Sequence, residues 1–404
     1  MLILILISVC LYKVINKISD TKIRKIVTKK LLISIMFQLF LLIIYRLELK
    51  YLGRVVYYSD AEDYWRHTLE YLSGNYYSAY NEVYIWICYF IQKSSPFVWV
   101  GWNNIYNILI TNLSIIMCSY IISIEKGEVK QFLNFTLFNP LVIYALMRNL
   151  KDATYLFFVC LIIYVYYLVK QIQSKFAWMF YFIFCIIMSI FLYGIRPWAF
   201  LTSIVAIYFI IEKIKIRSIT KLLLIGFFIF FIRIIITLNV NFKRMYDSVN
   251  LWLPIVLKSA QSLTLLEKIL AIPRLFLGPG PFRSILGHEY FLFYTLTGNI
   301  MAFLGSIFWW IELAIILSVI ITYGNIDVNK TSVFSRYMFY NLILFCIIYS
   351  MAYGGSSELR FRGVLYIMVS SWFFSVYKIK NINQIIVHVN IFLLIITIGS
   401  LIFG

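Results

Sequence analysis

The chain has 404 residues, of which 62% are hydrophobic and only 13% are charged, and its formal net charge is +19. Soluble globular domains carry about 25% charged residues, so this composition excludes an ordinary soluble fold. The basic residues stand in short clusters between apolar runs, a pattern that sets membrane orientation and does not indicate nucleic-acid binding. We expect a polytopic membrane protein.

Apolar runs recur along the whole chain. Segments such as 31–47 and 222–238 approach the ~20 apolar residues that a helix needs to cross ~30 Å of hydrocarbon. A helix also satisfies its own backbone hydrogen bonds within lipid. We predict an all-α, polytopic integral membrane protein that forms a single transmembrane domain over 1–404, with about twelve spans (range ten to thirteen). The predicted spans are 1–16, 31–47, 98–123, 132–147, 153–169, 176–193, 199–211, 222–238, 298–322, 337–353, 363–377 and 384–403.

Basic residues are distributed unequally between the two sets of connecting loops. One set, which begins with 13–30, consists of short loops that hold nineteen of the 36 Lys and Arg residues. The positive-inside rule places this set in the cytoplasm. The opposite set contains the two long outer segments, 48–97 and 239–297, in which 85–91 and 251–257 are expected to be interfacial helices. Both termini are then expected to face outward.

The first long outer segment carries Asp60, Glu62 and Asp63 just after the second span. A carboxylate at this surface can act as a general base toward a sugar hydroxyl, if it lies within about 3 Å of the proton that it removes. The alternative is that these acids are only solvated side chains of an exposed loop.

Basic residues also follow a break in the chain. The Asn139-Pro140 pair should kink or begin a helix, because proline lacks an N–H and biases the residue before it away from helical angles. Arg148, Lys151 and Asp152 then occupy a tight outer turn. The turn can bind phosphate, or Asp152 can simply complement the dipole of the next helix.

Other arginines occupy later outer turns or a span. Arg196 lies at the next outer turn, where snorkelling to the interface is the alternative to a functional role. Arg233 interrupts an apolar span and needs a partner there. The turn at 278–281 places Arg274 and Arg283 beside it, either as a phosphate cradle or only as a chain reversal.

The last outer turn, GGSSELRFRG, contains Arg360 and Arg362. The planar guanidinium group binds the oxygens of a diphosphate bidentately and stays charged at any working pH. The functional and the purely structural interpretation of these two residues both remain open.

In chain order the motifs are SDAEDYW, FNP followed by LKD, IRPW, GPGPFR and LRFRG. Over roughly residues 55–370 this order resembles the GT-C class of bacterial membrane glycosyltransferases and the oligosaccharide repeat-unit polymerases (Wzy type) of O-antigen and capsule assembly. The resemblance implies that Asp60 or Asp63 is the catalytic base. It also implies that basic residues hold the lipid phosphate, namely Arg148, Lys151, Arg196, Arg274, Arg283, Arg360 and Arg362, with Arg233 as an intramembrane candidate.

The resemblance further implies a substrate and a location. The substrate is expected to be a polyprenyl (undecaprenyl) phosphate- or diphosphate-linked sugar, handled in the bilayer at the outer face of the bacterial cytoplasmic membrane, with other polysaccharide-assembly membrane proteins as partners. Two large outer loops, the second markedly basic, favour a polymerase of lipopolysaccharide O-antigen or capsule over an enzyme that adds one sugar. No cofactor or metal motif is visible in the sequence, and a requirement for a divalent metal stays open because a second acidic motif is missing.

The competing class is a transporter or flippase of lipid-linked sugars. Such proteins commonly show internal repeats and paired broken helices in matching halves. The sequence shows neither feature. Glycosyl transfer is therefore the expected function.

Overall fold

The computed structural model describes residues 1–57, 59–75, 82–172, 174–213, 261–278, 295–323, 331–353, 359–378 and 382–403, and the single positions 226, 254, 258 and 281. Within these residues every regular element is a helix. The helices are α1 (Leu2–Asn16), α2 (Thr21–Tyr51), α3 (Ser59–Leu72), α4 (Glu82–Lys93), α5 (Gly101–Ile124), α6 (Val129–Leu137), α7 (Pro140–Met147), α8 (Asp152–Ile172), α9 (Lys175–Ile195), α10 (Leu201–Lys213), α13 (Leu265–Leu277), α15 (Leu296–Tyr323), α16 (Val333–Tyr353), α17 (Leu359–Val376) and α18 (Ile382–Phe403).

Six of the described helices are long and apolar enough to cross a membrane, namely α2, α5, α8, α9, α15 and α16. Shorter apolar helices cover Leu2–Asn16, Leu201–Ile210 and Ile385–Gly399. The protein is therefore a helical membrane protein, as its composition predicts. The count of twelve spans remains a prediction, because 132–147 is divided between α6 and α7 and because 222–238 lies outside the described residues, apart from Gly226.

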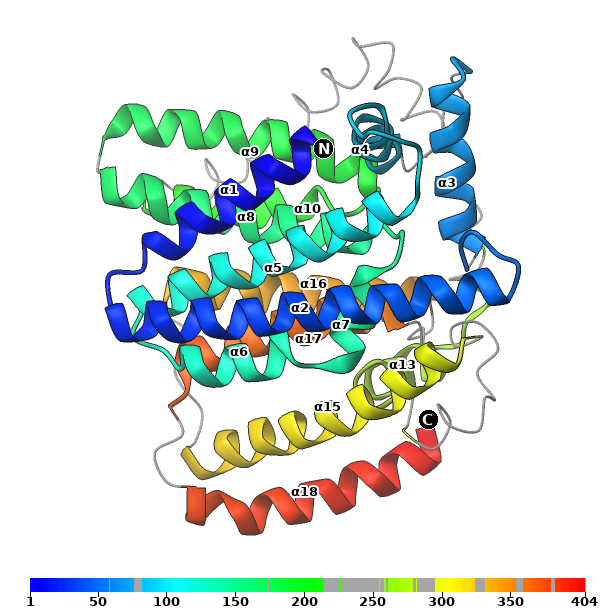
Figure 1. Ribbon diagram of the computed structural model, residues 1–404. Coiled ribbons are helices and arrows are strands. Elements are labelled where there is room, and N and C mark those ends of the chain that lie inside the picture. Colours follow the sequence, from blue (N-terminus) through cyan, green and yellow to red (C-terminus); the bar gives the residue numbers. More distant parts are fainter. Residues whose placement is uncertain are drawn as a thin grey trace.

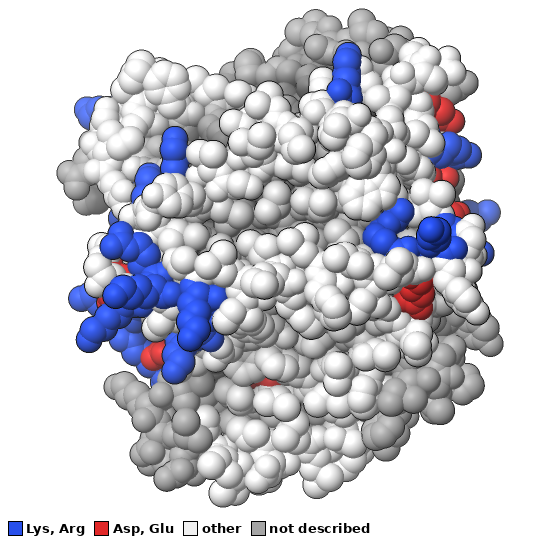
Figure 2. Space-filling view, in the orientation of Figure 1, with Lys and Arg blue, Asp and Glu red and all other residues white. Residues whose placement is uncertain are grey.

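Most helices lie roughly side by side, and α3 runs across one end of them (Figure 1). The C-terminus lies toward this same end, whereas the connection between α1 and α2 lies at the opposite end. Figure 2 shows Lys and Arg gathered toward the two ends of the molecule, while other residues cover most of the surface between them. Charged ends and an uncharged middle suit a protein whose sides face lipid.

The centre of the bundle is formed by α5 and α8. In the 18-residue apolar stretch of α5, 83% of the residues are buried, and in that of α8, 78%. The corresponding share is only 33% in α2 and in α9, which lie at the periphery. Close helix contact is possible where glycine replaces a side chain. At Gly305 of α15 an added Cβ atom would lie 2.2 Å from the Cβ atom of Leu141 in α7.

The Asn139-Pro140 pair begins α7, which confirms the predicted break. The Asn139 side chain accepts hydrogen bonds from the backbone N–H groups of Leu141 (3.0 Å) and Val142 (3.3 Å). Proline occupies the first turn, where its missing N–H is not needed. Residues 141–147 are all buried, so α7 carries the chain through the core to the turn that contains Arg148 and Lys151.

The first long predicted loop contains two helices, α3 and α4. The predicted interfacial segment 85–91 belongs to α4, where Ile85, Cys88 and Ile91 are fully buried. This helix packs against α3, α5 and α9. The second predicted interfacial segment, 251–257, lies outside the described residues except for Pro254.

Candidate functional site

Two acidic and three basic side chains from separate parts of the chain meet at the end of the bundle where α3 lies. Arg360, in the first turn of α17, donates a hydrogen bond to Asp60 at the start of α3, and its Nε atom lies 3.9 Å from Oδ2 of Asp152. Arg196, just after α9, donates to Oδ1 of Asp152. Lys151 precedes Asp152 and interacts electrostatically with the other four. We call these five side chains the ion-pair cluster.

Most of the ion-pair cluster is shielded from solvent. The side chains of Asp152, Arg196 and Arg360 are 2%, 6% and 8% exposed, whereas that of Asp60 is 30% exposed. Lys151 is also buried. Three cations face two carboxylates, so the cluster with Lys151 protonated carries an excess positive charge. It therefore favours an anionic ligand near Asp60.

The pKa values of Asp60 and Lys151 are both shifted by burial and by the other charges of the cluster. Burial alone would raise the pKa of Asp60, but the charge and hydrogen bond of Arg360, with a smaller contribution from Lys151, hold this pKa below its usual value. Burial lowers the pKa of Lys151 well below its usual value, and the charges of Arg196 and Arg360 lower it further. Asp60 is thus a carboxylate at neutral pH, and Lys151 holds its proton less tightly than an exposed lysine.

Asparagine side chains of α5 hold the turn between α7 and α8 in place. Asn104 donates from its amide to the Met147 carbonyl at 3.0 Å. Asn107 donates to the Leu150 carbonyl at 3.0 Å and also to the carbonyl of Arg148. Because this turn is buried, its carbonyl groups need such partners, and the amides fix the backbone that carries Lys151.

Asn149 joins the same turn to α3. Its Oδ1 atom accepts from the hydroxyl of Tyr84 at 3.0 Å and from the amide of Asn103 at 3.2 Å. Its Nδ2 atom donates to the carbonyl of Ala61 at 3.1 Å, next to Asp60 in the chain. The position of Asp60 relative to the turn is therefore set by a hydrogen-bond network that begins in α5.

The sequence prediction did not include these asparagines. Their signal is the segment WNNIYN, in which Asn103, Asn104 and Asn107 lie within two turns of an otherwise apolar span. Residues three and four apart share a helix face, so such a group predicts a polar contact inside the bundle.

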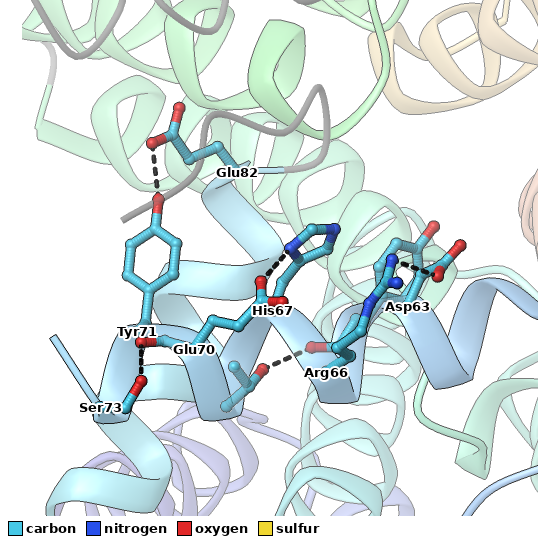
Figure 3. Close-up of polar contacts among 9 residues, drawn as sticks. Asp63, Arg66, His67, Glu70, Tyr71, Ser73 and Glu82 are labelled. Carbon is cyan, nitrogen blue, oxygen red and sulfur yellow. Dashed lines mark hydrogen bonds and ion pairs between the residues drawn. The ribbon is translucent and has the colours of Figure 1, made fainter. Parts of the chain in front are cut away.

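Asp63, the second predicted base, lies on the outer face of α3. Its side chain is 56% exposed and pairs with Arg66 at 2.9 Å (Figure 3). In the same close-up His67 lies 2.8 Å from Glu70, the next pair along the helix. Asp63 therefore forms a surface ion pair with a residue outside the ion-pair cluster.

Three of the other predicted basic residues, Arg148, Arg274 and Arg362, lie in the described part of the chain but outside the ion-pair cluster. Arg148 is buried, and its guanidinium group lies 5.2 Å from the ring centre of Tyr144, within range of a cation–π interaction. Arg362 is fully buried and donates to the backbone carbonyl of Arg274 at 3.1 Å. This contact ties the start of α17 to α13. Arg233 and Arg283 lie outside the described residues.

The cluster combines one partly exposed carboxylate with adjacent guanidinium groups. Guanidinium groups bind phosphate oxygens, and a carboxylate accepts a proton from a hydroxyl. Within the described part of the chain, no group of three or more His, Cys, Asp and Glu side chains is arranged to hold a metal ion.

The chain was compared with protein-family models, curated proteins and solved structures. The chain matches no family model, no curated protein and no solved structure.

Proposed function

We propose that the protein is a glycosyltransferase that uses a lipid-linked sugar, and that it polymerises polyprenyl diphosphate-linked repeat units of O-antigen or capsule. The observation that carries the proposal is the contact of Asp60 with Arg360, which in turn lies beside Asp152 and its partner Arg196. These residues belong to motifs that are far apart in the sequence and whose order resembles that of membrane glycosyltransferases. Their meeting at one end of the helices supports a common site.

The proposed reaction uses the two kinds of charge in the cluster. The oxygen of an acceptor hydroxyl attacks the anomeric carbon, the bond from that carbon to the diphosphate oxygen breaks, and its electron pair leaves with the diphosphate. The acceptor proton passes to the Asp60 carboxylate. Arg196 and Arg360 stabilise the charge that develops on the leaving group, and loss of one such donor typically costs about 10²–10³ in rate.

The ion pair itself implies an order of events. In the structure Arg360 donates a hydrogen bond to the carboxylate of Asp60 and forms an ion pair with it. A diphosphate competes for the same guanidinium group, because its oxygens accept two parallel N–H bonds. Substrate binding would thus free Asp60 to receive the acceptor proton.

The proposal includes a topology. The chain crosses the bacterial cytoplasmic membrane about twelve times, with the ion-pair cluster and both termini at the outer face. The first turns of α2 carry Lys22, Arg24, Lys25, Lys29 and Lys30. This end of α2 lies opposite α3 (Figure 1), so its charge supports the proposed orientation.

One observation favours the transport alternative. Glu312, within α15, is fully buried and accepts a hydrogen bond from Ser370 of α17. A carboxyl group inside a membrane span is a functional candidate by default. If the protein is a transporter, Glu312→Gln abolishes its function and Asp60→Asn does not. If it transfers sugars at the ion-pair cluster, Asp60→Asn abolishes its function and Glu312→Gln does not. Addition of a single sugar, as in GT-C enzymes, is the third possibility.

Deletion of the gene in its host, followed by gel separation of the surface polysaccharide, tests the proposal. If the protein is a polymerase, the deletion strain should lose the ladder of polysaccharide bands and retain only the band with a single repeat unit. The intact gene should then restore the ladder. A ladder with its rungs kept but a changed repeat mass indicates addition of a single sugar. An unchanged polysaccharide would contradict both forms of the proposal.

A further inference from the structure

Two grooves meet on the surface beside α2 and α3. The first has a volume of about 750 Å³ and lies between α2 and α5. The second has a volume of about 790 Å³ and follows the outer face of α3. Arg54 and Val55, in the connection between α2 and α3, line both grooves. The two grooves therefore adjoin.

The first groove, which we call the apolar groove, faces outward from the bundle. Its lining includes Leu39, Ile43 and Leu47 of α2, which are 38%, 58% and 62% exposed. These side chains lie one helical turn apart along α2, so they form a continuous aliphatic strip. The apolar groove thus suits a hydrocarbon chain that runs parallel to the helix.

The end of the apolar groove nearest α3 is basic. Arg46, Lys50 and Arg54 line it there. Arg46 donates to the Val55 carbonyl at 2.7 Å, and Arg54 lies 3.5 Å from the Glu62 carboxylate. Lys50 is exposed and has no ion-pair partner among the described residues. Three cations beside one carboxylate complement a phosphate group.

The second groove, which we call the polar groove, has different chemistry. Trp65 lines it together with the charged side chains of Glu62, Arg66 and Glu70 and the hydroxyl of Ser73. An aromatic face offers apolar contact area, while the charged and hydroxyl groups donate and accept hydrogen bonds. A sugar presents the same two kinds of surface, an apolar ring face and a rim of hydroxyl groups.

We infer that the two grooves together bind one amphiphilic ligand, a phosphate-bearing lipid with a sugar head group. Its chain lies in the apolar groove, its phosphate contacts Arg46, Lys50 and Arg54, and its sugar lies along the polar groove. The inference rests on the proposed function for the identity of the ligand as a sugar carrier. This ligand is the acceptor, because the proposed reaction assigns the leaving diphosphate of the donor to Arg196 and Arg360. Glu62, which pairs with Arg54, is two residues from Asp60, so the junction of phosphate and sugar lies at the end of α3 that carries the cluster.

Lipid binding to the purified full-length protein, measured by native mass spectrometry from detergent, tests the phosphate site. The probes are a polyprenyl monophosphate, phosphatidylglycerol and phosphatidylcholine. Arg46→Gln/Lys50→Gln should weaken binding of the polyprenyl monophosphate at least tenfold. The matched control, Arg24→Gln/Lys25→Gln, removes the same charges at the opposite end of α2 and should leave this binding unchanged. If both double variants lose binding of the polyprenyl monophosphate to the same extent, the inference is overturned. It is also overturned if phosphatidylglycerol binds as tightly as the polyprenyl monophosphate and loses binding to the same extent in Arg46→Gln/Lys50→Gln.

Two further variants test the grooves without removing charge. Ile43→Trp fills the apolar groove and should weaken binding of the polyprenyl monophosphate, whereas Trp65→Ala should weaken only a polyprenyl phosphosugar. Retention of a normal elution volume in gel filtration identifies correctly folded variants. If all variants bind both lipids as the intact protein does, the inference fails while glycosyl transfer can still be correct. If binding follows the predictions but deletion of the gene leaves the polysaccharide unchanged, the proposed function fails and the site remains.

Discussion

Replacement of Asp152 by asparagine is expected to destabilise the protein much more than the same change at Asp63. Asp152 is 2% exposed, and its two arginine partners are less than 10% exposed. Removal of one member of a buried ion pair leaves an uncompensated charge and costs about 3–5 kcal/mol. The pair of Asp63 with Arg66 is exposed at 56% and 64%, and exposed pairs contribute only about 0.2–1 kcal/mol.

The cysteines of the chain provide the assay for this comparison. Cys88, Cys118, Cys160 and Cys185 are buried and free, so a thiol-reactive fluorophore reports their exposure on heating. At roughly 2 °C per kcal/mol for a large domain, Asp152→Asn should lower the unfolding midpoint by about 6–10 °C and Asp63→Asn by at most about 2 °C. Equal midpoints for the two variants would refute the argument that the ion-pair cluster is shielded from water.

Three other changes have defined outcomes. Asn107→Leu leaves two buried carbonyl groups of the turn before α8 without their amide donor, which costs about 1–3 kcal/mol for each; an unchanged midpoint in the same assay would contradict the network. Gly305→Ala places a Cβ atom 2.3 Å from the backbone nitrogen of Leu141 and should cost about 1–3 kcal/mol, so a midpoint at or above that of the intact protein would exclude the close contact of α15 with α7. Because the pKa of Asp60 in the free protein is held below its usual value, the transfer rate at a substrate concentration far below KM should stay constant as pH falls to about 5 and decline only near or below the ordinary aspartate pKa of about 3.9. In Arg360→Gln the residual activity should begin to decline at a higher pH, because burial then raises the pKa of Asp60. If the initial rates of this variant and of the intact protein decline at the same low pH, Asp60 is not the group that accepts the proton.

Local sequence signals predicted the helical class and the start of α7. Runs of apolar residues indicate membrane helices by length alone, and Asn139-Pro140 combines an N-cap with a residue that is tolerated only in the first turn. The same signals placed Asp60 and Arg360 between predicted spans, and their location at the outer face stays a prediction. Their contact was not, because the two residues are 300 positions apart and meet only through the packing of separate helices.

Only the three-dimensional structure distinguishes the two candidate bases, Asp60 and Asp63. Asp60 and Asp63 are three residues apart in an acidic motif, and the sequence offers no reason to prefer one. In the structure Ala61, Tyr64 and Thr68 are buried, so this face of α3 turns inward. Asp60 shares that face with Tyr64, one helical turn away, whereas Asp63 points toward the surface.

Complementation of the gene deletion with single aspartate variants tests whether Asp60 is the catalytic base. Strains that carry Asp60→Asn or Asp63→Asn are compared with the intact gene at equal protein levels in the membrane, and the surface polysaccharide is separated on a gel. Asp60→Asn is expected to leave the polysaccharide absent, because the acceptor proton then has no carboxylate to receive it, while Asp63→Asn should restore the polysaccharide. Full restoration by Asp60→Asn would contradict the assignment of this carboxylate as the base and with it the proposed mechanism.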